Sequence, residues 1–176
     1  MTEKTNKPTQ GTKKKNISLR LNESTVVPDL RTVVVLGVER GGTSMAAGML
    51  RALGINMGDR AGLNHEDPMF LVDEHDKLRR RIQTRNRDNP VWGFKVPKAS
   101  LHLPFYEKTL RNPYYVVVYR NPLSIVDSWM QRGAGAPVDV LDRIATYQAA
   151  ILELIKTTKA PLLLLNYERA VQDAAA

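Results

Sequence analysis

The sequence predicts a three-layer α/β fold with a mainly parallel central sheet. Continuous apolar, β-branched runs alternate along the chain with segments of helical periodicity, which is the pattern of strands that are buried on both faces of a parallel sheet. In addition, a glycine-rich turn joins the first of these runs, residues 32–36, directly to a helical segment. We therefore expect a strand, a turn and a helix to begin the folded part of the chain.

The composition is that of one compact domain. The chain has 176 residues, of which 43% are hydrophobic, and this is sufficient for a substantial core. It has no cysteine, and its three histidines lack the spacing of a zinc site, so we expect neither disulfides nor a metal. No apolar run is long enough to span a membrane or to serve as a signal peptide. These features predict a cytoplasmic protein without a membrane span.

The positive charge is concentrated near the N-terminus. The formal net charge is +8, and residues 1–31 contain seven Lys and Arg against three Asp and Glu. This segment has too little apolar content to fold alone. We therefore predict a disordered basic arm over residues 1–29 and a single domain over residues 30–176. A solvated tail is the favoured interpretation of the arm over nucleic-acid or lipid binding.

The turn after the first strand has the composition of a phosphate-binding loop. Glycines allow the backbone to approach an anion, and a helix N-terminus presents N–H groups to it. The spacing of Gly37 and Gly42 resembles a P-loop, which indicates a P-loop NTPase-like fold, but Thr43 stands where the P-loop lysine is needed. A turn without a ligand is the alternative. The candidate binding residues are Arg40, Gly41, Gly42, Thr43 and Ser44.

A helix is predicted to begin near residues 65–68, because Pro68 suits a first turn and acidic residues favour a helix N-terminus. Phe70, Leu71, Leu78 and Ile82 would form its buried face. The arginines of this segment, which include Arg85, are expected mostly on a solvated face, with contact to an acidic substrate as the alternative.

Two further strands are predicted at residues 91–96 and 114–119. The segment between them, residues 101–110, is expected to form a helix broken by Pro104. Arg120 follows the later strand and precedes a helix over residues 123–130. The carboxyl end of a parallel strand is where open α/β sheets bind ligands, so Arg120 is well placed for an anion. A surface ion pair is the alternative.

The last predicted elements are a helix over residues 138–156 and a buried strand over residues 162–165. The turn at residues 133–137 is rich in glycine and could lie over the site. The helix is expected to bury one stripe, formed by Leu141, Ile144, Gln148, Ile151 and Ile155.

Four segments resemble the sulfotransferase family. Residues 38–44, VERGGTS, are similar to its 5′-phosphosulfate loop, although Glu39 replaces the usual proline and Gly41 the usual serine. Residues 119–129, YRNPLSIVDSW, are similar to its 3′-phosphate motif, with Arg120 and Ser128 in the motif's positions. Residues 92–98, WGFKVPK, resemble its Trp-Gly-x-Lys-x-Pro segment, and Asn166-Tyr167-Glu168-Arg169 resembles the pair after its last core strand, which we interpret as structural.

The resemblance implies transfer of a sulfuryl group from 3′-phosphoadenosine 5′-phosphosulfate to a hydroxyl or amine, without a metal. It implies that Arg120 and Ser128 bind the 3′-phosphate, that Arg40 and the turn bind the 5′-phosphosulfate, and that Lys95 lies near the reacting groups. Glu66 is the candidate general base, because residues 64–70 resemble a bacterial form of the family. His65 and Asp67 are alternative bases, and capping of a helix is the alternative role for Glu66 and Asp67.

Other functions remain open from the sequence. A noncatalytic relative that binds a nucleotide or a partner is one alternative, and a P-loop kinase or NTPase is another. The acceptor would be a small molecule or a carbohydrate, bound by loops near residues 55–64 and 133–137.

Overall fold

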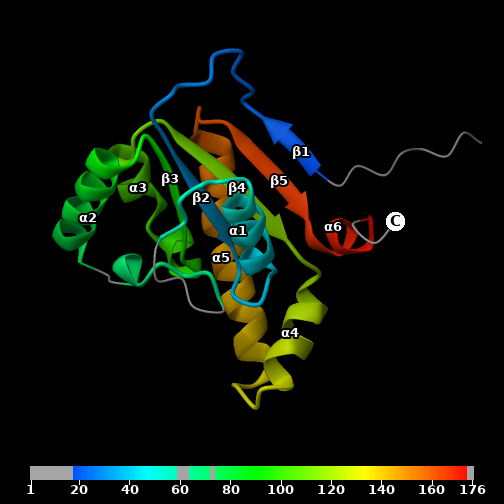
Figure 1. Ribbon diagram of the computed structural model, residues 1–176. Coiled ribbons are helices and arrows are strands. Elements are labelled where there is room, and N and C mark those ends of the chain that lie inside the picture. The colour runs from blue at the N-terminus through cyan, green and yellow to red at the C-terminus, as the bar shows by residue number, and fades with distance from the viewer. Residues whose placement is uncertain (1–17, 59–63, 72–73, 174–176) are drawn as a thin grey trace, which may run out of the picture.

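The computed structural model describes residues 18–58, 64–71 and 74–173. Within them, five strands form one sheet in the order β1-β5-β4-β2-β3 (Figure 1). The strands are β1 (Ser18–Leu21), β2 (Arg31–Gly37), β3 (Val91–Lys95), β4 (Pro113–Tyr119) and β5 (Leu162–Asn166). The α-helices are α1 (Thr43–Ala52), α2 (His75–Asp88), α3 (Leu103–Thr109), α4 (Pro122–Met130), α5 (Pro137–Thr157) and α6 (Tyr167–Asp173), and two short 3-10 helices are η1 (Pro68–Phe70) and η2 (Pro97–Leu101).

Helices cover both faces of the sheet, as Figure 1 shows for α1 in front and α5 behind. Side chains of β2 alternate between the two layers. Val34 and Leu36 pack in the cluster that contains residues of α2, α3 and α5, whereas Val35 packs with Ala46 and Ala47 of α1. The predicted three-layer α/β fold is confirmed, and β2 to β5 lie within or close to the ranges predicted from the apolar runs.

The sheet places two turns at one point. Strand β2 pairs in parallel with β3 on one side and with β4 on the other. The chain runs from β2 to β3 on one side and from β4 to β5 on the opposite side, so the connections after these two neighbouring strands diverge. In open α/β sheets, ligands bind in the crevice beyond the carboxyl ends of the strands at such a switch point. The residues that follow β2 and β4 meet there.

The prediction of a disordered arm over residues 1–29 is wrong for residues 18–21, which form a strand. Ser18–Leu21 form β1, which pairs antiparallel with β5 in the register Ser18 to Leu165. The side chain of Asn22 then donates hydrogen bonds to the carbonyls of Thr158 and Ala160, at 3.0 and 3.1 Å. Backbone pairing with an exposed sheet edge stabilises a segment that buries little apolar surface, and apolar content alone does not reveal it. Residues 1–17 lie outside the described residues.

The helix predicted near residues 65–68 begins later. Pro68 instead starts η1, and α2 starts at His75. Residues 72–73 lie outside the description. The solvated position expected for Arg85 is also wrong, because this side chain is 8% exposed and forms an ion pair with Asp67 at 2.7 Å. Arg85 is buried because it pairs with the buried carboxylate of Asp67, which lies outside the helix.

Two other helices differ in detail. Pro104 does not break a helix but occupies the first turn of α3, where its missing N–H costs nothing. In α5 the buried stripe consists of Val140, Ile144, Tyr147, Ile151 and Leu154, and Leu141 is 42% exposed. No helix in the described part of the chain is both long and apolar enough to cross a membrane.

Tyr115 makes the stability of the protein sensitive to alkaline pH. Its ring is 1% exposed, and its hydroxyl is buried without a hydrogen-bond partner among the described residues. Burial, and to a lesser degree the charge of Glu107, raises the pKa of Tyr115, and burial also raises the pKa of Tyr147 to about 12. A raised phenol pKa contributes stability that is fully present below pH ~10 and is lost as the pH rises above this value.

We therefore expect Tyr115→Phe to lose less stability than the wild type at high pH. The difference between the two unfolding free energies should change by about 1 kcal/mol in favour of the variant between pH 9 and 11. At pH 7 the variant should be as stable as the wild type or more stable, because it removes an unsatisfied hydroxyl. Urea denaturation at each pH measures both effects, and parallel pH profiles would contradict the prediction.

Candidate functional site

The turn between β2 and α1 is the centre of the candidate site. The N–H of Gly41 donates to the carbonyl of Val38 at 2.9 Å, and Arg40 has a φ of 64°. A hydrogen bond from the fourth residue to the first, with positive φ at the third, defines a type II turn. A Cβ on Gly41 would lie 2.7 Å from the carbonyl oxygen of Val38. The turn is therefore too tight for a side chain at this position.

Gly42 joins the turn to α1. It has a φ of 87° and no side chain caps the helix, so the N-terminal N–H groups and the positive end of the helix dipole remain available to an anion. A Cβ on Gly42 would lie 2.1 Å from the ring of Tyr167, the first residue of α6. Thr43 is 4% exposed, and the hydroxyl of Ser44 donates to the carbonyl of Asn64 at 3.0 Å.

Arg40 links the two residues that were expected to bind one phosphate. Its Nε donates to Oγ of Ser128 at 3.1 Å, and its carbonyl accepts a hydrogen bond from Nη1 of Arg120 at 2.7 Å. Ser128 lies on α4 and Arg120 follows β4. The two residues are thus connected through Arg40, and direct binding of one phosphate by both remains a prediction.

Arg120 retains unused hydrogen-bonding capacity. Its guanidinium lies over the ring of Tyr167, with 4.9 Å between Cζ and the ring centroid. Its Nε is buried and has no hydrogen-bond partner among the described residues. A buried N–H of this kind is costly unless another group accepts from it.

Lys95 and Glu66 form an ion pair beside the turn. Lys95 is the last residue of β3, its side chain is 2% exposed, and its Nζ lies 2.9 Å from Oε1 of Glu66. The Glu66 side chain is 28% exposed. A buried ammonium needs such a partner, so the carboxylate is held close to the end of the sheet while remaining accessible.

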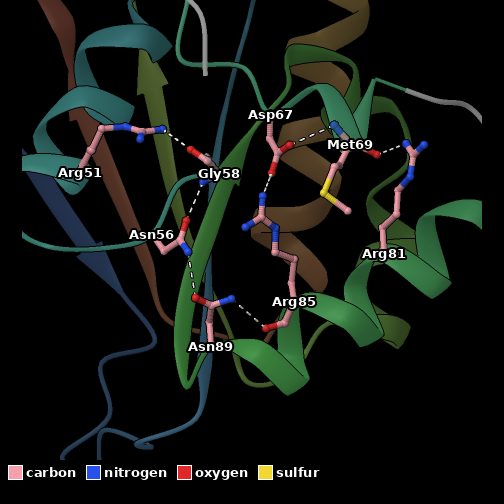
Figure 2. A network of polar contacts seen from close by, with 8 residues as sticks. All are labelled: Arg51, Asn56, Gly58, Asp67, Met69, Arg81, Arg85 and Asn89. Carbon is pink, nitrogen blue, oxygen red and sulfur yellow. Dashed lines mark hydrogen bonds and ion pairs between the residues drawn. The ribbon is translucent and has the colours of Figure 1, made fainter. Parts of the chain in front are cut away.

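A network of polar contacts fixes the segment that carries Glu66. Figure 2 shows Asp67 between Arg85 of α2 and the backbone of Met69, to which it is hydrogen-bonded at 2.7 and 2.9 Å. Arg81 donates to the carbonyl of Met69. In the same view a chain of hydrogen bonds runs through Arg51, Gly58, Asn56, Asn89 and Arg85.

The two alternative bases, His65 and Asp67, do not line the cavity described below. Asp67 is 1% exposed and caps η1 by accepting from the N–H of Met69, so the capping role is confirmed for this residue. His65 has a φ of 54°, and its Nδ1 is buried without a partner in the described ranges. Neither residue lines the cavity described below, whereas Glu66 does.

A cavity of about 460 Å³ lies at the carboxyl ends of the strands. This volume is within the range of small-molecule sites. Four cationic side chains and two carboxylates line it, which favours an anionic ligand. Its lining residues are Glu39, Arg40, Gly42, Thr43, Ser44, Met45, Asn64, Glu66, Lys95, Pro97, Arg120, Trp129, Arg132 and Tyr167.

Most of the predicted site residues line this cavity. Gly41 and Ser128 do not, although Gly41 forms the turn and Ser128 accepts from Arg40. Three further lining residues were not predicted from the sequence, namely Trp129, Arg132 and Tyr167. Trp129 directly follows Ser128, and Arg132 lies in the turn after α4, so helical spacing from Ser128 gave no signal for either residue.

Among the described residues, no group of three or more His, Cys, Asp or Glu side chains could hold a metal ion.

Comparisons with known proteins show a likeness in fold. No protein-family model matches the chain, and a search of curated proteins finds no match. Among solved structures, the chain is similar to the sulfotransferase domain of the olefin synthase from Synechococcus PCC 7002, with a TM-score of 0.53, 16% identity, and coverage of 88% of this chain and 72% of that one. It is also similar to TT1252 from Thermus thermophilus, with a TM-score of 0.48, 18% identity, and coverage of 83% and 96%.

Gly42 should tolerate a side chain poorly for two reasons, its positive φ and the ring of Tyr167. Gly54 offers a matched control, because its φ is 86° and a Cβ there would meet nothing within 4 Å. Gly54→Ala should cost about 1 kcal/mol of unfolding free energy from the backbone alone. Gly42→Ala should cost a further ~1–3 kcal/mol from the clash. Equal losses in urea denaturation would show that the ring moves aside freely.

Asp67 should contribute to stability through its buried pair with Arg85. We expect Asp67→Ala to lower the unfolding free energy by about 3–5 kcal/mol, because it removes one partner of a buried ion pair. The exposed pair of Arg87 and Asp88 on α2 is the control, and Asp88→Ala should have little effect on stability because solvent screens this pair. Chemical denaturation of both variants checks the difference, and similar small losses would contradict it.

Proposed function

We propose that this protein is a sulfotransferase that moves a sulfuryl group from 3′-phosphoadenosine 5′-phosphosulfate to a hydroxyl or amine of a small-molecule or carbohydrate acceptor. The observation that carries the proposal is the single cavity that the glycine turn, Arg120 and the Lys95–Glu66 pair share at the switch point of the sheet. The likeness in fold to a domain described as a sulfotransferase supports it.

The residues present fit the donor. It carries anionic groups at two ends, and the cavity offers two sets of donors for them. The turn and the uncapped N-terminus of α1, with Thr43 and Ser44, would hold the 5′-phosphosulfate. Arg120, whose buried Nε lacks a partner among the described residues, would hold the 3′-phosphate together with Ser128. Arg40 would act with the turn on the 5′-phosphosulfate.

The chain's own residues would perform three tasks. Glu66 would accept the proton of the acceptor's O–H or N–H. Lys95, which orients Glu66 by the 2.9 Å contact, and Arg40 would stabilise negative charge on the transferred and leaving groups. The turn and α1 would hold the reactants in line. The donor supplies the activated sulfuryl group.

A noncatalytic nucleotide-binding relative is the second candidate. The observation that favours it is the direct pairing of Glu66 with Lys95, which occupies the candidate base. A kinase or NTPase is less well supported, because the first residue of α1 is Thr43 rather than the lysine that would contact the outer phosphates.

Binding of adenosine 3′,5′-bisphosphate, the desulfated donor, is the first test. Isothermal titration should show binding to the wild type, and Arg120→Ala should weaken it about 10- to 100-fold, the effect of one or two charge-assisted hydrogen bonds. Arg80→Ala, on the exposed face of α2, should bind like the wild type. Stronger binding of magnesium ATP would overturn the proposal in favour of an NTPase.

Turnover is the second readout of the same prediction. With the sulfated donor and a panel of hydroxyl and amine acceptors, the wild type should release the desulfated nucleotide. Glu66→Gln should slow this release about 10²- to 10⁴-fold while leaving nucleotide affinity unchanged. Binding without turnover in either form would establish the noncatalytic alternative.

A further inference from the structure

Glu39 places a carboxylate in a cavity whose other features favour an anion. It is the second residue of the turn and lines the cavity next to Arg40. Its side chain is 26% exposed, so solvent screens it only in part. An unpaired carboxylate here would repel a phosphate or sulfate group, or would pair with Arg40 and reduce the charge available to a ligand.

Arg143 of α5 forms an ion pair with the carboxylate of Glu39. Its Nη1 lies 2.9 Å from Oε2 of Glu39. Its guanidinium also lies over the indole of Trp129 on α4, with 5.3 Å between Cζ and the ring centroid. Two contacts from different elements therefore determine where the guanidinium lies.

The pairing leaves Arg40 with other partners. Arg40 directs its Nε to Ser128 rather than to its neighbour Glu39. The turn is thus held by two side-chain contacts, one from Arg40 to α4 and one from Glu39 to α5. Each of the two charged side chains of the turn therefore has a partner other than its neighbour.

We propose that Arg143 is a positioning residue for the anion site, because it neutralises Glu39 and keeps that carboxylate from competing with the bound anion for Arg40. This inference rests on the proposed function, since it concerns binding of the donor's anionic groups in the same cavity. Arg143 itself need not touch the ligand. The effect is electrostatic and acts through Glu39.

A purely structural role for the contact between Glu39 and Arg143 predicts a different pattern of binding among the variants. If the contact only held α5 to the turn, removing either partner would impair binding, and removing both would not repair it. If the contact neutralises a harmful charge, only the loss of Arg143 is damaging, and the loss of the Glu39 charge repairs it.

The experiment measures binding of adenosine 3′,5′-bisphosphate by titration to the full chain and four variants. Arg143→Ala should weaken binding about tenfold at low salt, and this deficit should shrink at high salt. Glu39→Gln should bind as well as the wild type or more tightly. The double variant should recover wild-type affinity to within about threefold. Arg143→Lys, which keeps the charge, should retain most of the affinity.

Two controls separate general damage from the proposed effect. Lys156→Ala removes an exposed ion pair with Glu153 on the same helix and should not change affinity. Adenosine, which carries no charge, should not distinguish the wild type from Arg143→Ala.

The outcomes distinguish this inference from the proposed function. Tight binding by the wild type with no rescue in the double variant, or no loss in Arg143→Ala, would overturn the role of Arg143 alone. Failure of the wild type to bind the nucleotide would overturn the proposed function and this inference together.

Discussion

The hydrogen bonds that converge on Arg40 are the contacts on which the site depends. Its backbone adopts a positive φ, which is costly for a residue with a side chain and persists only where surrounding contacts enforce it. Arg120 binds its carbonyl and Ser128 accepts from its side chain. The same residues therefore enforce the strained turn and present positive charge, so the shape of the turn and its electrostatics cannot be altered separately.

The sheet order explains why these residues meet. Arg40, Arg120 and Ser128 are far apart in sequence, but β2 and β4 are neighbours whose carboxyl ends lie side by side. Lys95 arrives from β3 on the other side of β2. A parallel sheet with connections in both directions brings three strand ends to one crevice. Arg40 follows β2, Arg120 follows β4 and Lys95 ends β3, so each strand end contributes a cationic side chain. The positive charge of the cavity thus follows from topology as much as from composition.

The sequence predicted the elements whose signal is local. Buried strands and the glycine turn are visible as apolar runs and spacing, and Arg120 and Lys95 stand at strand ends that such runs define. What it missed depends on partners distant in the chain. Strand β1 exists because β5 offers an edge, Arg85 is buried because Asp67 reaches it, and Tyr167 lines the cavity because Gly42 leaves room for its ring. No local pattern in the sequence records such pairings.

Glu66 and Asp67 are adjacent, yet each holds a cation from a different part of the fold. Glu66 is tied to the end of β3 through Lys95, and Asp67 is tied to α2 through Arg85. One peptide unit therefore bridges a strand of the sheet and a covering helix. Because this unit has almost no slack, a shift of α2 along the sheet would be transmitted to the carboxylate in the cavity wall. The place of that carboxylate in the cavity wall thus depends on the position of α2 as well as on Lys95.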